Sequence, residues 1–254
     1  MQLEYRYYEI IDSTNNEIKR IAEEGEKEGI VVSAGEQTCG RGRRGHVWKS
    51  PSSDSIATSI LLRPCVHTEN VSRITILAAM AVCDAIKEKY DLDTKIKWPN
   101  DVLIKEKKVC GILTEMSAEN NKVKYVVPGI GVNVHNMSFQ EDIKDMATSI
   151  DMELKMAGKK DNSSRKELTE TIWKSFSGYY DKFIKTEDLN DVKIRYNNLL
   201  VNKGREVRVL DPKGEYNGVA LGIDDTGALM VDTGDRIVSV DAGEVSVRGV
   251  YGYV

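Results

Sequence analysis

The pattern of hydrophobic and polar positions near the N-terminus predicts a strand, a helix and a second strand. Residues 3–10 and 30–34 are short runs rich in Tyr, Ile and Val, which are typical of strands. Between them, Ile18, Ile21 and Ala22 form one apolar face at helical spacing. Thr14 and Glu17 lie three residues apart at the start of this helix and match a capping box.

The middle of the chain predicts a longer helix followed by antiparallel strands. Residues 69–90 keep a 3.6-residue apolar period and form the strongest helical pattern in the sequence. Strands are expected at 54–62, 95–102 (interrupted by Pro99), 103–104, 108–116 and 123–134, with a hairpin tip at 120–122. Further helices are expected at 162–184 and 188–200, and a short helix or turn at 141–150.

From about Val201 the pattern changes to short alternating strands separated by turn residues. These strands are expected at 206–210, 216–223, 229–231, 237–240 and 244–248. Such spacing is typical of a small β-barrel. We therefore predict an α+β domain over residues 1–200 and a small all-β domain over residues 201–254.

Composition and charge narrow the class of protein. Of 254 residues, 41% are hydrophobic and 30% are charged, which is ordinary for a globular protein. The net charge of −4 argues against a surface that grips nucleic acid, so we expect no DNA partner. Four scattered cysteines and three histidines predict no structural metal. Neither a signal peptide nor a membrane-length apolar run is visible, so we expect a cytoplasmic protein that does not contact membranes.

A run of alternating glycine and arginine stands out against this acidic background. We call residues 36–48 the Gly-Arg loop; its sequence is Glu-Gln-Thr-Cys-Gly-Arg-Gly-Arg-Arg-Gly-His-Val-Trp. Glycine allows close backbone approach to a ligand, and arginine matches carboxylate or phosphate. The run also fits the dinucleotide pattern G-x-G-x-x-G, but a turn-rich segment follows where that motif needs a helix. A kinase reading fails because the sequence has no H-R-D or D-F-G.

Other polar clusters have both structural and functional interpretations. Asp12-Ser13-Thr14 fits a helix cap or a ligand contact, and residues 97–101 (K-W-P-N-D) fit a turn or a site for a metal or basic partner. Lys108 begins an apolar strand, where a lysine usually reaches towards solvent. Strand alternation predicts that Lys108, Cys110, Ile112 and Thr114 share one face.

The order of these motifs resembles the catalytic domain of biotin–protein ligases. The motifs are D-S-T-N, then G-R-G-R-R-G with a following W and S-P, then K-W-P-N-D, K-x-x-G-I-L-x-E and G-x-G-x-N. The E-V-S-V-R-G ending also resembles their C-terminal domain. The resemblance implies a central mixed β-sheet flanked by helices, with a small C-terminal SH3-like β-barrel. It implies activation of biotin by ATP and Mg²⁺ to biotinyl-5′-AMP, then transfer to a lysine of a carboxylase's biotin carboxyl carrier domain.

The resemblance also implies roles for individual residues. It implies that biotin is bound by Ser13, Thr14, Gln37, Gly40, Arg41, Arg43, Lys108 and Gly111. It implies that ATP and the adenylate are bound by Arg43, Arg44, Trp48, Asn100, Lys108, Gly131 and Asn133. Lys108, Arg41 and Arg43 carry the catalytic charge, and Asp101 orients Mg²⁺ or the incoming carrier lysine. Residues 136–148 match a loop that orders over the adenine, and the Gly-Arg loop closes over the ligand.

Departures and alternatives complete the prediction. The chain begins at the first strand of the catalytic domain, so we expect the monofunctional form without a DNA-binding domain, and a homodimer. His46 and Cys39 stand where relatives often have arginine and alanine. One alternative is a lipoate or octanoate ligase or transferase of the same fold, in which Cys110 would be the nucleophile. Another is a non-catalytic biotin-responsive binding protein.

Overall fold

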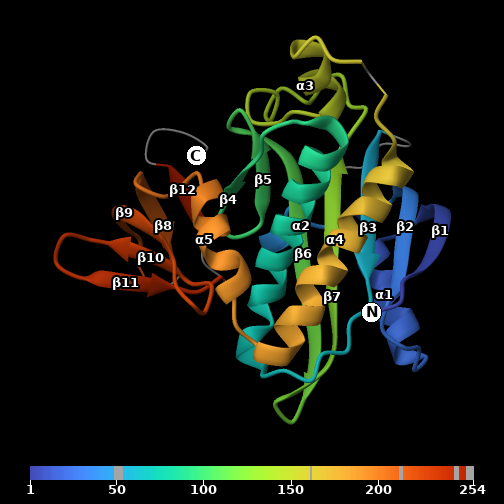
Figure 1. Cartoon of the computed structure of the whole chain (residues 1–254), viewed down its shortest axis with the longest axis horizontal. Coiled ribbons are helices and arrows are strands. Elements are labelled where there is room, and N and C mark those ends of the chain that lie inside the picture. The colour runs from blue at the N-terminus through green and yellow to red at the C-terminus, as the bar shows by residue number, and fades with distance from the viewer. Residues whose placement is uncertain (49–53, 161, 212–213, 243–245, 250–254) are drawn as a thin grey trace.

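A computed structural model describes residues 1–48, 54–160, 162–211, 214–242 and 246–249 (Figure 1). Within them the chain forms a seven-stranded sheet and a separate five-stranded sheet. The larger sheet contains β1 (Glu4–Ile11), β2 (Ile30–Gln37), β3 (Ser55–Ile60), β4 (Lys95–Lys97), β5 (Asp101–Ile104), β6 (Lys107–Glu119) and β7 (Lys122–Asn133). The helices are α1 (Thr14–Glu23), α2 (Ser72–Tyr90), α3 (Ile150–Met156), α4 (Arg165–Thr186) and α5 (Asn190–Leu199), with short 3₁₀ turns η1 (Arg43–Gly45) and η2 (Thr68–Asn70).

The larger sheet is mixed, as predicted. Its strand order is β1-β2-β3-β7-β6-β5-β4, in which β1 and β2 are parallel and every other neighbouring pair is antiparallel. The parallel pair is joined by α1, because parallel neighbours need a crossover connection. The long β6–β7 hairpin turns at Asn120 and Asn121, which both take positive φ, a conformation that asparagine tolerates.

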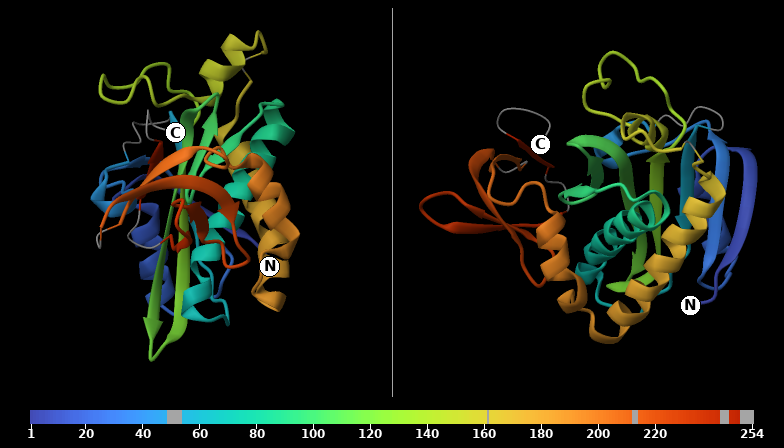
Figure 2. Two further views of the ribbon diagram at one scale, coloured as in Figure 1. Left: turned by 90° about the vertical axis from the view of Figure 1, so that its left-hand side faces the viewer. Right: turned by 45° about the horizontal axis from the view of Figure 1, so that its top comes forward.

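Helices cover the two faces of this sheet unequally (Figures 1 and 2). On one face α1 packs its apolar side, including Ile18 and Ile21, on Val32, Leu61 and Val127. On the other face α2 packs against β5, β6 and β7, and α4 lies beside it and contacts both α2 and β3. α2 is buried along most of its length. The face beneath α1 thus carries only one short helix, and polar groups beside that helix can remain accessible.

The predicted C-terminal all-β unit is also present. It consists of β8 (Glu206–Leu210), β9 (Tyr216–Ile223), β10 (Leu229–Asp232), β11 (Ile237–Val240) and β12 (Ser246–Gly249), all antiparallel in the order β11-β10-β9-β8-β12. The predicted strand 244–248 begins in residues that lie outside the described ones. The two units meet at Trp98, whose backbone N–H donates to Asn202 Oδ1 at 2.9 Å and whose indole N–H donates to the Gly227 carbonyl at 3.1 Å. A division after residue 200 remains a prediction.

One local expectation needs correction, and one helix was not predicted. The capping box is wrong: Ser13 occupies the cap position, Thr14 bonds with Gln37, and the Glu17 carboxylate accepts from Tyr8. The segment 141–146 forms turns, but α3 follows it at Ile150 and was not predicted. The Ser149 hydroxyl caps α3 by accepting from Met152 N–H. No helix in the described part of the chain is long and apolar enough to span a membrane.

Candidate functional site

Two glycines face each other across β6 and β7 and leave a flat strip of bare backbone. Gly111 and Gly131 are direct cross-strand partners, and the Trp48 indole ring lies against both. A Cβ atom at Gly131 would lie 2.4 Å from Trp48 Cε2, and one at Gly111 would lie 3.0 Å from Trp48 Cζ3. A side chain at either position would displace the ring, and glycine is required for this close approach. We call this pair the glycine floor.

Lys108 lies beside this floor because β6 contains a bulge. Val102 pairs with Cys110, whereas Leu103 pairs with Lys108, so Val109 is the extra residue. The bulge reverses the predicted alternation: a Cβ at Gly111 would lie 3.1 Å from Lys108 Nζ, whereas Cys110 points into the core on the opposite face. The prediction that Lys108 shares a face with Cys110 is therefore wrong.

The Lys108 ammonium is held by a carboxylate and an aromatic ring. Lys108 Nζ lies 2.7 Å from Asp101 Oδ1 and 5.7 Å from the centre of a Trp48 ring. Asp101 follows the Trp98-Pro99 cis peptide bond at the start of β5. The K-W-P-N-D turn and the start of β6 are therefore brought together by strand pairing.

Lys97 adds a second lysine near this ion pair, and sequence reasoning did not single it out. Its side chain is almost completely buried at the end of β4, opposite Asp101. Burial lowers the pKa of Lys97 to about 8, against the attraction of Asp101 and with further lowering by Lys108 and Arg248. The signal available in the sequence was its place as the first residue of K-W-P-N-D.

The buried polar side chains Ser13, Thr14 and Ser59 gather with Gln37 at the start of α1, and we call this group the polar pocket. Gln37 Oε1 accepts from the Thr14 backbone N–H at 2.9 Å and lies 3.2 Å from the Thr14 hydroxyl. Ser59 Oγ on β3 lies 2.7 Å from Thr14 Oγ1. Ser13 is also buried here, at the helix cap. The predicted ligand residues Ser13, Thr14 and Gln37 are thus adjacent, and Thr14 also contacts Ser59, a serine that the motifs did not identify.

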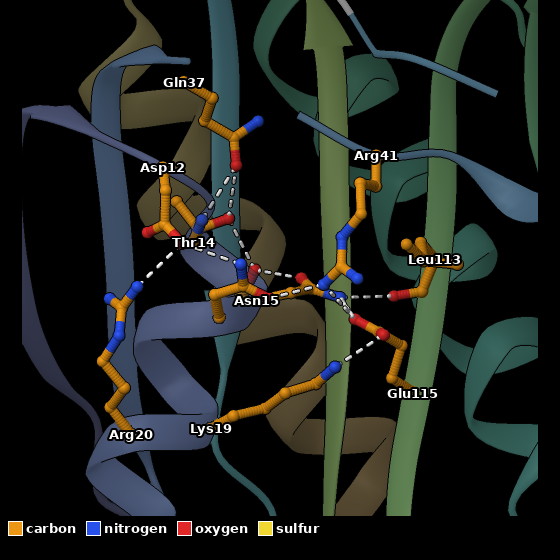
Figure 3. A network of polar contacts seen from close by, with 11 residues as sticks. Asp12, Thr14, Asn15, Lys19, Arg20, Gln37, Arg41, Leu113 and Glu115 are labelled. Atoms are coloured by element: carbon orange, nitrogen blue, oxygen red, sulfur yellow. Dashed lines mark hydrogen bonds and ion pairs between the residues drawn. The ribbon is translucent and has the colours of Figure 1, made fainter. Parts of the chain in front are cut away.

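A carboxylate on β6 links this pocket to the Gly-Arg loop (Figure 3). Glu115 Oε1 lies 2.6 Å from Lys19 Nζ, while its Oε2 accepts from Asn15 Nδ2 at 2.7 Å and lies 3.5 Å from Arg41 Nη2. Burial acts to raise the pKa of Glu115, but Lys19, Asn15 and Arg41 together bring it below its ordinary value. The glutamate was quoted in the K-x-x-G-I-L-x-E motif without a role.

The Gly-Arg loop folds back on itself and spreads its arginines to different anchors. Gly40 accepts from Trp48 N–H at 3.0 Å, and a Cβ at Gly40 would lie 2.3 Å from the Trp48 carbonyl. Arg43 donates to Asn100 Oδ1 at 3.1 Å and to the Ala242 carbonyl, whereas Arg44 takes φ of +56° in η1. The Trp48 indole N–H is buried without an acceptor among the described residues. The motif residues at 50–51 lie outside them.

Among the residues assigned to the nucleotide, Asn133 lies at the end of β7, and the predicted adenine loop follows it. Asn133 donates to the Thr148 carbonyl at 3.1 Å. Lys108 N–H donates to Met146 at 2.7 Å, and Thr148 N–H donates to Lys108 at 2.9 Å. The end of the predicted adenine loop is therefore attached to the backbone of Lys108.

This arrangement suits ligands that carry anions. Lys108 lies at the glycine floor with Asp101 as its acidic partner, and Arg43 is bound to the neighbouring Asn100. Arg41 contacts Glu115 beside the polar pocket, so cationic side chains lie near both places. Cys110, by contrast, is fully buried on the opposite face, and burial raises the pKa of its thiol well above the ordinary value. A cysteine nucleophile at Cys110 is therefore inconsistent with the structure.

Comparison with known proteins agrees with this geometry. Residues 7–133 match the Biotin/lipoate A/B protein ligase family, and residues 204–248 match the Biotin protein ligase C terminal domain. The chain is 35% identical to the bifunctional ligase/repressor BirA of Bacillus subtilis over 95% of this chain and 73% of that protein. It is 31% identical to the biotin–[acetyl-CoA-carboxylase] ligase of Mycobacterium tuberculosis over 92% and 85%.

A solved structure extends the similarity to the whole architecture. The biotin protein ligase from Aquifex aeolicus in complex with biotin and ATP superimposes with a TM-score of 0.82 at 30% identity, covering 97% of this chain and 99% of that one. The mixed sheet and the C-terminal β domain are both included in this match. The chain therefore belongs to the Biotin/lipoate A/B protein ligase family, and within it to the biotin protein ligases.

Proposed function

We propose that the chain joins biotin to ATP as biotinyl-5′-AMP and then transfers the biotinyl group to a lysine of a carboxylase's biotin carboxyl carrier domain. The observation that carries this proposal is the position of Lys108. Its ammonium lies at the glycine floor, against Gly111. Its backbone forms hydrogen bonds with Met146 and Thr148, at the end of the predicted adenine loop. An elongated ligand lying along the floor would present its reacting centre to this lysine.

The first step brings two anions together. A carboxylate oxygen of biotin attacks the α-phosphorus of ATP, and the bond to pyrophosphate breaks. Lys108 and the two loop arginines, Arg41 and Arg43, cancel the combined negative charge, which is the kind of electrostatic contribution that often dominates catalysis. Because the product is a mixed anhydride that water hydrolyses, closure of the Gly-Arg loop over it would protect it.

The second step needs a neutral amine. The ε-amine of the carrier lysine attacks the acyl carbon of the adenylate, AMP leaves, and the amine loses a proton. Asp101 lies 2.7 Å from Lys108 Nζ and is the carboxylate suited to accept that proton or to orient the amine.

Asp101 is also the side chain suited to help hold Mg²⁺ brought by ATP. Mg²⁺ is usually bound by one or two carboxylates together with substrate phosphates, so a single carboxylate fits. No cluster of three or more acidic, histidine or cysteine ligands occurs in the described ranges, consistent with a metal that arrives with the nucleotide. Bound there, Mg²⁺ would neutralise phosphate charge.

The carrier and a second copy of this chain are both candidates for the exposed edge of β6. β5 pairs with residues 107–111 of β6, and this pairing ends at Gly111. Among the described residues, 113–119 of β6 therefore have no strand partner on that side. A groove of about 580 Å³ adjoins this edge, lined by residues that include Arg43, Thr75 and Met116. Unpaired strand edges accept added strands, so this edge supports both carrier docking and the expected homodimer.

One assay tests the proposed function. The protein is incubated with biotin, ATP, Mg²⁺ and a carrier domain, and pyrophosphate release and biotinylated lysine are measured. Lys108→Ala is expected to abolish pyrophosphate release. Lipoate or octanoate replacing biotin with equal efficiency would refute the proposal and favour the other activity of the fold.

A further inference from the structure

The carboxylate of Glu115 lies at one end of a continuous hydrogen-bond chain that reaches the polar pocket (Figure 3). From Glu115 the chain runs through Asn15 and Ser59 to Thr14, on β6, α1, β3 and α1 in turn. Asn15, Ser59 and Thr14 are all at least nine-tenths buried, so water does not replace these contacts. The direction of each hydrogen bond therefore matters for what the pocket can bind.

The donor-to-acceptor direction of the chain is set first at the Glu115 carboxylate, because an ionised carboxylate can only accept hydrogen bonds. Asn15 directs its Nδ2 to Glu115 Oε2 at 2.7 Å and to the Leu113 carbonyl at 3.3 Å. Because neither partner can donate, the amide orientation of Asn15 is fixed. Its Oδ1 must then face Ser59 Oγ, at 2.6 Å, and can only accept from it.

The protons of the two hydroxyls follow from this. Ser59 has one proton, and its short contact with Asn15 Oδ1 takes it. The 2.7 Å contact between Ser59 Oγ and Thr14 Oγ1 then requires the proton of Thr14. Only the longest of the three contacts, 3.2 Å from Thr14 Oγ1 to Gln37 Oε1, is left without a proton, and Gln37 Oε1 still accepts from Thr14 N–H. Thr14 Oγ1 and Gln37 Oε1 thus both present lone pairs.

We propose that Glu115 is a positioning residue that fixes the direction of this chain and so makes the pocket an acceptor of ligand N–H groups. The cyclic urea of biotin carries N–H donors, whereas lipoate and octanoate carry none at the corresponding end. The inference rests on the proposed function, since it assigns this end of the pocket to the biotin ring. Glu115 has a second effect, because its negative charge keeps Lys19 and Arg41 together at the pocket.

The test removes the carboxylate from position 115 in one variant, and in a second variant moves it to position 15. Glu115→Gln keeps the shape but introduces an amide that can donate as well as accept, so the direction of the chain then depends on the longer 3.3 Å contact between Asn15 Nδ2 and the Leu113 carbonyl. The double variant Asn15→Asp with Glu115→Gln restores a group at position 15 that only accepts, with the same total charge. The new amide at position 115 then donates to the new carboxylate at position 15, which replaces one of the two contacts of Asn15 Nδ2, while the contact with the Leu113 carbonyl is lost. Ser59 must then donate to position 15 again, and Thr14 to Ser59.

The expected result is a selective change in KM. Glu115→Gln should raise KM for biotin about tenfold, with KM for ATP within about twofold, since charged hydrogen bonds carry effects of this size. The double variant should recover most of the loss. Glu119→Gln is the matched control on the same strand, because Glu119 is exposed and only pairs with Lys124 at 3.8 Å.

Two outcomes would overturn the inference while leaving the proposed function intact. One is an active wild-type enzyme whose Glu115→Gln variant keeps its KM for biotin. The other is a double variant, folded by circular dichroism, that binds biotin no better than Glu115→Gln in calorimetry. Absence of biotinyl-5′-AMP formation by the wild-type chain would instead contradict the proposed function.

Discussion

Alanine substitutions at the two glycines of the glycine floor should damage activity to different extents. At Gly131 a new Cβ would lie 2.4 Å from Trp48 Cε2 and 2.7 Å from both Cζ2 and Nε1. Carbon atoms normally approach to about 3.5 Å, so the indole must rise by about 1 Å, and any ligand lying on the floor must rise with it. At Gly111 the nearest atoms lie at 3.0 and 3.1 Å, and two of them belong to the flexible end of Lys108. The required shift there is about half as large.

We therefore expect Gly131→Ala to be more damaging than Gly111→Ala. Overpacking of this kind costs about 1–3 kcal/mol, which corresponds to a loss of roughly 5- to 150-fold in kcat/KM for Gly131→Ala. Pyrophosphate release measures the loss, and ligand-induced change in Trp48 fluorescence, with Trp48→Phe as the blank, reports the position of the ring. Gly178→Ala on α4 is the control, because no atom lies within 4 Å of its added Cβ. Activity of Gly131→Ala within twofold of wild type, or a greater loss for Gly111→Ala, would refute the reasoning.

Four further predictions follow from the same site. Asp101→Asn should slow transfer to the carrier more than adenylate formation, as separate single-turnover measurements of the two steps would reveal. Met116→Glu, at an exposed position in the groove beside β6, should raise KM for the carrier domain several-fold with adenylate formation unchanged. Cys110→Ala should keep ligase activity, and loss of activity in the folded variant would revive the transferase alternative. Because burial lowers the pKa of Lys97 to about 8, the unfolded chain binds more protons between pH 8 and about 10.5, so wild-type Tm should rise across this interval relative to Lys97→Met.

Local patterns predicted most of the fold, because each strand and helix carries its own periodicity. The helix α2, the strands β8, β9 and β11 and the C-terminal all-β domain are predicted from spacing alone, and the mixed central sheet follows from the motif resemblance. The bulge at Val109 was not predictable in this way, since it is defined by the register with β5. That single residue decides whether Lys108 faces the glycine floor or the core.

The candidate site was predictable to the same extent. The resemblance predicts Thr14, Gln37 and Lys108 as site residues because each lies in or beside one of its ordered motifs. Ser59 lies in a buried strand that reads as ordinary core, and Lys97 sits in a motif whose other members drew attention first. Their importance arises from contacts between strands distant in sequence, which no local pattern contains.

The anchoring of Trp98 bears on how such proteins can diversify. Its indole bonds to the C-terminal unit, and a Cβ at Gly227 would lie 2.5 Å from the Ile76 side chain, so the second unit is fitted against α2 and the K-W-P-N-D turn at once. One continuous cluster of buried residues contains Trp98 together with Val207 and Leu229. A recombination that exchanged the C-terminal unit alone would have to match this surface in detail. The two units are therefore expected to be inherited together, as a single module rather than as interchangeable parts.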